Sequence, residues 1–159
     1  MPRQEIRSYD YVNRPYREVR DALAADPAAV FRAATRAAAD RGRAVAGALK
    51  VRIGGLDVAA DVVFTIGDVE EGTGGAVGGP FMRLPVSWEA AAHPAWFPLM
   101  DGVLTVYPLT STETQLDFLG RYDPPLGVVG EAVDALVGHR IAEASVHRFI
   151  ADVARYLRA

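Results

Sequence analysis

Hydrophobic residues at every second position dominate the middle of the chain, from about residue 45 to residue 123. Alternation with a period of two is typical of β-strands that bury one face. The pattern predicts strands over residues 45–53, 56–66, 84–90, 99–107 and 112–122. Gly54 and Gly55 favour a tight hairpin between the first two of these strands. Because most of the connections are short, we expect an antiparallel sheet.

The N-terminal region predicts one more strand and two helices. Residues 4–12 are rich in β-forming side chains, which brings the expected number of strands to about six. Residues 15–24 carry a short helical pattern, and Asp26 provides an N-cap signal for a second helix over residues 27–41. We expect Gly42 to end that second helix.

The C-terminal part predicts the longest helix, over about residues 126–157. Projected at 100° per residue, this helix has one apolar face and one basic face. The apolar face carries Val128, Ala132, Ala135, Ala142, Val146, Ile150, Val153 and Leu157. The opposite face carries Arg140, Arg148, Arg155 and Arg158. Because the helix is too long to be covered by another helix, we expect the sheet to cover it.

Composition narrows the class of protein. The 159 residues fit one domain that spans the whole chain, and half of them are hydrophobic. The absence of cysteine excludes disulfides and thiolate metal sites. A net charge of −3 gives no general attraction for nucleic acid. The sequence shows no signal-peptide pattern and no run long enough to span a membrane, so we expect a cytoplasmic protein.

Three segments resemble the SRPBCC superfamily, which contains START-related lipid-binding domains, aromatic polyketide cyclases and pollen-allergen-like proteins. They are NRPYREV at residues 13–19, TQLDFLGRYDPPLG at 114–127 and RFIADVARYL at 148–157. The resemblance spans essentially the whole chain. It implies the α+β helix-grip fold, in which a curved antiparallel sheet surrounds a long C-terminal helix and two short helices follow the first strand. It also implies a cavity between sheet and helix that accepts a hydrophobic small molecule, and it carries over no catalytic residue.

The inward-facing positions of this fold are the candidate ligand-binding residues. They are Phe64, Leu84, Val86, Trp88, Leu104, Leu116, Phe118, Gly120, Tyr122, Leu136, His139 and Glu143. A glycine inside a strand, such as Gly120, marks the close approach of a ligand or lets the strand bend around the helix. The Tyr122 hydroxyl is either a polar contact for a ligand or part of the packed core.

Four residues are weak candidates for catalysis. His139 and Glu143 are one helical turn apart, so they form either an acid–base pair or a histidine packed under the sheet beside a solvated glutamate. Tyr122 would face the same cavity. Asp101 interrupts an apolar run and is either solvated or a buried carboxylate. We find no Ser–His–Asp arrangement, no GxSxG elbow and no metal-ligand spacing, and we expect no cofactor or metal.

Five glycines gather in residues 72–79. No Lys-Ser/Thr pair follows them, so the phosphate-binding loop motif does not fit. The segment is therefore either a lid at the rim of the cavity or a passive connection.

Three functions remain open from the sequence. The first is a non-catalytic carrier or sequestering module for a lipid or polyketide-like molecule. The second is a polyketide cyclase or dehydratase-like enzyme that uses the same cavity. The third is a protein-interaction module with a vestigial cavity, whose partner the sequence does not identify.

Overall fold

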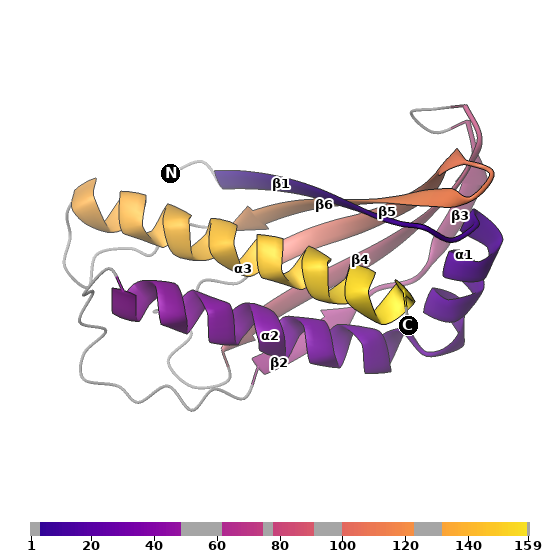
Figure 1. Ribbon diagram of the computed structural model, residues 1–159. Coiled ribbons are helices and arrows are strands. Elements are labelled where there is room, and N and C mark those ends of the chain that lie inside the picture. The colour runs from indigo at the N-terminus through magenta and orange to yellow at the C-terminus, as the bar shows by residue number, and fades with distance from the viewer. Residues whose placement is uncertain (1–3, 49–61, 75–77, 91–99, 123–131, 159) are drawn as a thin grey trace.

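The computed structural model describes residues 4–48, 62–74, 78–90, 100–122 and 132–158. Within these ranges, strands of one antiparallel sheet lie behind two long helices, and a short helix lies near one end of the sheet (Figure 1). The strands are β1 (Gln4–Val12), β2 (Val62–Ile66), β3 (Glu70–Thr73), β4 (Pro80–Ala90), β5 (Met100–Thr110) and β6 (Glu113–Tyr122). The helices are α1 (Tyr16–Ala25), α2 (Pro27–Ala48) and α3 (Ala132–Arg158). The α+β class with six antiparallel strands is confirmed.

The strand order is β1-β6-β5-β4-β2, and β3 pairs with β4 beside this path. Strands β4, β5 and β6 lie close to their predicted positions. The segment Glu70–Thr73, for which the hydrophobic pattern predicts no strand and which overlaps the glycine-rich segment, is the strand β3. The predicted strand over residues 56–66 is confirmed for Val62–Ile66, and the Gly54–Gly55 hairpin lies outside the described residues.

The second helix is longer than predicted. It continues through Gly42 to Ala48, so residues 45–48 are helical and the strand expected there is wrong over those residues. Alanine has the highest helix propensity, and the alanines between Gly42 and Ala48 offset the cost of the glycines. Packing against α3 adds further stabilisation, because α2 and α3 lie side by side in opposite directions (Figure 1).

This pairing also corrects the prediction that no helix would cover α3. The 22-residue α2 flanks the 27-residue α3 on one side. Strands β1 and β6 lie against α3 on another side. The predicted apolar face of α3 is confirmed wherever its side chains are described, because all of these residues are buried: Ala142, Val146, Ile150, Val153 and Leu157. The arginines of the predicted basic face are exposed.

The pairing register places the inward side chains in rows that cross the sheet. The first, which we call the large row, contains Phe64, Trp88, Met100 and Tyr122. The next, which we call the glycine row, contains Ile66, Val86, Gly102, Gly120 and Ile6. The third contains Leu84, Leu104, Phe118 and Ser8. Large side chains therefore stand on both sides of a strip that two adjacent glycines leave bare.

The ring of Phe118 fills the bare strip. A Cβ atom added to Gly102 would lie 2.2 Å from Cζ of Phe118. A Cβ atom added to Gly120 would lie 3.0 Å from Cε1 of Phe118 and 2.7 Å from Sδ of Met100. Gly120 is therefore a close-approach position, and its neighbours are side chains of the protein itself.

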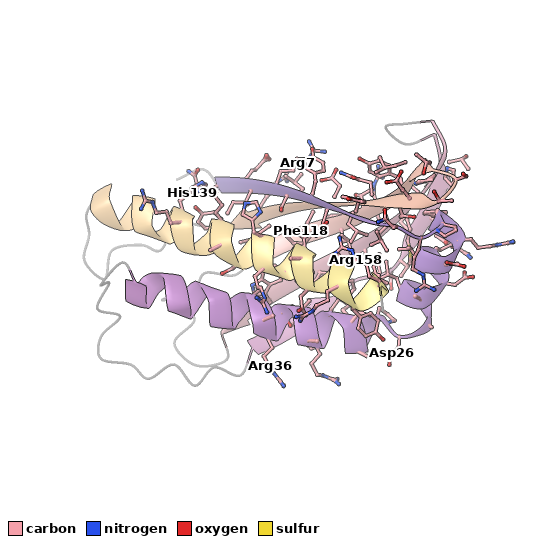
Figure 2. All side chains as sticks on the ribbon, viewed as in Figure 1. Arg7, Asp26, Arg36, Phe118, His139 and Arg158 are labelled. Atoms are coloured by element: carbon pink, nitrogen blue, oxygen red, sulfur yellow. The ribbon has the colours of Figure 1, made fainter. Side chains whose placement is uncertain are left out.

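Aromatic rings join the sheet to both long helices. The Phe149 ring of α3 lies 4.9 Å from the Phe118 ring and 4.8 Å from the Trp88 ring, centroid to centroid. The Phe31 ring of α2 lies 5.9 Å from Phe149. Figure 2 shows Phe118 between the sheet and α3. The middle of the interior is thus occupied by packed aromatic rings from the sheet, α2 and α3.

Candidate functional site

A buried hydroxyl and a half-exposed imidazole meet at one end of the interior. Tyr122, the last residue of β6, is only 1% exposed, and its Oη lies 2.7 Å from Nδ1 of His139. The His139 side chain is 40% exposed and lies in the first half of α3 (Figure 2). Burial raises the pKa of Tyr122 to about 12, and the negative charge of Glu143 adds to this effect. The phenol is therefore protonated at neutral pH and available for hydrogen bonding.

Two further residues extend this contact along α3. One carboxylate oxygen of Glu143 lies 3.7 Å from Nε2 of His139, and the other lies 3.8 Å from Nε2 of His147. Nδ1 of His147 lies 2.8 Å from Oγ of Ser8, which is buried in β1. We call Tyr122, His139, Glu143, His147 and Ser8 the polar chain. Its two ends are buried hydroxyls of the sheet, and its centre is a carboxylate that solvent reaches.

Helical spacing explains the geometry of the polar chain. Residues 139, 143 and 147 are separated by four positions each, so their side chains form one ladder along α3. This ladder borders the apolar face of the helix and lies above β1 and β6. Tyr122 and Ser8 project from the inner face of these two paired strands. Each hydroxyl therefore meets one imidazole of the ladder.

The arrangement is suited to proton transfer. An imidazole between a phenol and a carboxylate can accept a proton from one side while the carboxylate stabilises the resulting charge. A second hydroxyl–imidazole–carboxylate series is formed by Ser8, His147 and Glu143. The sequence did not show this arrangement. Ser8 is buried beneath α3, so its Oγ is not accessible as a nucleophile.

The structure brings together three of the four catalytic candidates. Tyr122, His139 and Glu143 are in contact, whereas Asp101 is exposed on the outer face of the sheet. Ser8 and His147 were not among the candidates from the sequence, in which His147 is expected only to be exposed, as it is. The four-residue spacing could have identified His147, but Ser8 reaches the chain only through the packing of β1 against α3.

The remaining candidate ligand-binding residues lie mainly in the core. Those that are buried are Leu84, Val86, Trp88, Leu104, Leu116 and Phe118. Phe64 is half-buried against this core. For Leu136 the structure describes the backbone in α3 but not the side chain.

The glycine-rich segment lies far from the Tyr122–His139 pair. Gly74 N–H donates to the carbonyl of Gly79 at 3.0 Å, and Gly74 and Gly78 have positive φ angles, as expected near the turn of the β3–β4 hairpin. The hairpin joins β4 at Pro80, and the large row crosses β4 at Trp88, eight residues further along the strand. Eight strand residues correspond to roughly 26 Å. A lid over the Tyr122–His139 pair would therefore have to come from another segment.

The described residues offer neither a metal site nor a membrane-spanning helix. Among them, no group of three or more histidine, aspartate and glutamate side chains is placed to hold a metal ion. No helix in the described part of the chain is both long enough and apolar enough to cross a membrane.

Known proteins resemble this chain in structure but not in sequence. No family model and no curated protein matches the sequence. The Zhui aromatase/cyclase from Streptomyces sp. R1128 superimposes with a TM-score of 0.51 at 8% identity, over 98% of this chain and 94% of that protein. The protein TTHA0849 from Thermus thermophilus superimposes with a TM-score of 0.50 at 12% identity, over 97% of each chain. At these identities the likeness concerns architecture alone, and it shows that this chain has the helix-grip fold.

Proposed function

We propose that the protein binds an apolar small molecule between the sheet and α3 and carries or sequesters it. The observation that carries this proposal is the large row. From Trp88 through Met100 to Tyr122 it is a run of large, buried apolar side chains with a single hydroxyl at its end. Small-molecule pockets are mostly apolar, with a few polar groups that orient the ligand. A lipid or polyketide-like compound fits this description.

The ligand site is assigned to the end of the interior that is marked by the Tyr122–His139 pair. The middle is occupied by the rings of Phe31, Phe118 and Phe149. The helix-grip likeness to an aromatase/cyclase and the resemblance to the SRPBCC superfamily both support an interior site. We infer from the same resemblance that the chain is a member of that superfamily.

Binding of an apolar fluorescent probe such as N-phenyl-1-naphthylamine tests the proposal. Met100→Trp adds bulk to the large row, and Val106→Phe adds bulk six residues along the same inner face of β5. Both changes overpack the core and cost about 1–3 kcal/mol of stability. We expect a dissociation constant on the order of 1 µM for the unaltered protein, at least about tenfold weakening by Met100→Trp, and little change with Val106→Phe. Absence of binding, or equal weakening by both variants, would contradict the proposal.

A second function, acid–base catalysis of a cyclisation or dehydration, is favoured by one observation. The Tyr122 hydroxyl lies 2.7 Å from His139 Nδ1, with Glu143 on the other side of the ring. Mass spectrometry of freshly purified protein, under conditions that preserve complexes, separates the two functions. A carrier releases a bound molecule of unchanged mass after incubation. An enzyme that dehydrates its ligand releases one that has lost water, and an enzyme that only cyclises it releases an isomer of the same mass with a changed chromatographic retention; His139→Gln would stop either change without stopping binding.

A further inference from the structure

The hydrogen bonds of the polar chain have a direction, and this direction determines what a ligand must offer to Tyr122. The carboxylate of Glu143 is an acceptor only, and it faces Nε2 of His139 at 3.7 Å. This charge favours the neutral tautomer that carries its hydrogen on Nε2. Nδ1 of His139 is then the acceptor in its 2.7 Å contact with Tyr122, so the phenol donates its hydrogen to His139.

Once its hydrogen is committed to His139, the Tyr122 oxygen has lone pairs but no hydrogen to offer. The oxygen already has His139 as a partner, and a ligand that donates to its lone pairs gains a second hydrogen bond at the same atom. Among the other members of the large row, Phe64 and Met100 are apolar, and Trp88 carries one donor, its indole N–H. At the Tyr122 end of the row, ligands are therefore distinguished by their capacity to donate one hydrogen bond.

We propose that the interior site selects an apolar ligand that carries a hydroxyl donor, such as a phenol or an alcohol, over an otherwise similar ether or ketone. Tyr122 is the residue that determines this specificity, and Glu143 positions it by fixing the tautomer of His139. The inference rests on the proposed function, because it requires that an apolar ligand reach the Tyr122 end of the large row.

Two probes of nearly the same shape test the selection. At pH 8, 2-naphthol donates a hydrogen bond and 2-methoxynaphthalene only accepts one. We expect 2-naphthol to bind about fivefold more tightly in calorimetry or equilibrium dialysis, as one neutral hydrogen bond allows. Tyr122→Phe should reduce this ratio to about one while leaving 2-methoxynaphthalene binding unchanged, since the ring remains.

Glu143→Gln tests the positioning role, with Glu18→Gln as its control. Glu18 is also an exposed helical glutamate paired with a basic side chain four residues away. We expect Glu143→Gln to lower the selectivity and to mix the two tautomers of His139, which ring ¹⁵N chemical shifts report directly. Glu18→Gln should change neither quantity.

The outcomes separate the inference from the function on which it rests. Binding of both probes with equal affinity, or a preference that survives in a folded Tyr122→Phe variant, overturns the selection but leaves apolar binding intact. A His139 tautomer with its hydrogen on Nδ1 in the unaltered protein also overturns it. Failure of both probes to bind contradicts the proposed function itself, and the inference falls with it.

Discussion

Adding one methyl group at Gly102 should disturb the core more than its size implies. The new Cβ of Gly102→Ala would lie 2.2 Å from Cζ of Phe118 and within 3 Å of two more atoms of that ring. A contact of that length requires the ring to move. At Gly79 the nearest atom to an added Cβ is Cγ of Pro108 at 3.9 Å, an ordinary van der Waals contact. Gly79→Ala is therefore the matched control.

The two effects at Gly102 oppose each other. Replacing a strand glycine by alanine gains about 0.5–1 kcal/mol, because the unfolded chain loses freedom. Overpacking a dense core costs about 1–3 kcal/mol. The Phe118 ring cannot retreat easily, because the Phe149 ring lies 4.9 Å away, centroid to centroid, and the Trp88 ring 5.6 Å away. We therefore expect a net loss of about 1–2 kcal/mol for Gly102→Ala and a change within about 0.5 kcal/mol for Gly79→Ala.

Urea unfolding of the two variants, followed by circular dichroism, measures both values. A double-mutant cycle with Phe118→Leu identifies the cause. In that background the side chain facing Gly102 is smaller, so the cost of Gly102→Ala should fall by about 1 kcal/mol. Equal stability of the Gly102→Ala and Gly79→Ala variants would refute the reasoning, as would a cost that does not change when Phe118 is shortened.

Two further predictions concern α3 and its partner Tyr122. Val146→Asp places a carboxylate in the apolar core and should cost several kcal/mol of stability, enough to prevent folding. Ala151→Asp, on the exposed side of α3, should cost less than about 1 kcal/mol. Equal shifts in melting temperature for the two variants would mean that Val146 is not on the buried face. Because the pKa of Tyr122 is raised to about 12 in the folded protein, the stability due to the neutral phenol is complete below pH 10 and is lost as the pH rises toward 12. Urea titrations at pH 9 and pH 11.5 should therefore show a larger loss for the unaltered protein than for Tyr122→Phe, and an equal loss would contradict the burial of this group.

The spacing of hydrophobic residues predicted the helices and strands that bury a single face. The apolar stripe of α3 and the alternation in β5 and β6 belong to this group, because a single core-facing side determines which positions are apolar. The end of α2 does not. Gly42 indicated a helix end, but α2, which lies alongside α3, continues past it to Ala48. Strand β3 has no alternation to detect, since it forms by pairing Glu70–Thr73 with the start of β4.

The candidate site was predictable in part for a similar reason. His139 and Glu143 are four residues apart, so the helix itself determines that they are neighbours. Their contact with Tyr122 depends on how the sheet is placed against α3, which local patterns do not encode. Ser8 lies 139 positions before His147 in the sequence, and a single serine in a strand carries no signal for such a contact. The filling of the glycine row by Phe118 likewise depends on the register of β5 and β6.

The proposed apolar ligand would occupy the interior at the Tyr122 end of the large row. Nuclear Overhauser effects between bound 2-naphthol and protein with isotope-labelled methionine methyl groups and tyrosine rings test this claim most directly. We expect contacts from the naphthol protons to the Met100 methyl group and to the Tyr122 ring. Contacts only to Tyr9 and Tyr11, which are exposed on the outer side of β1, would contradict it.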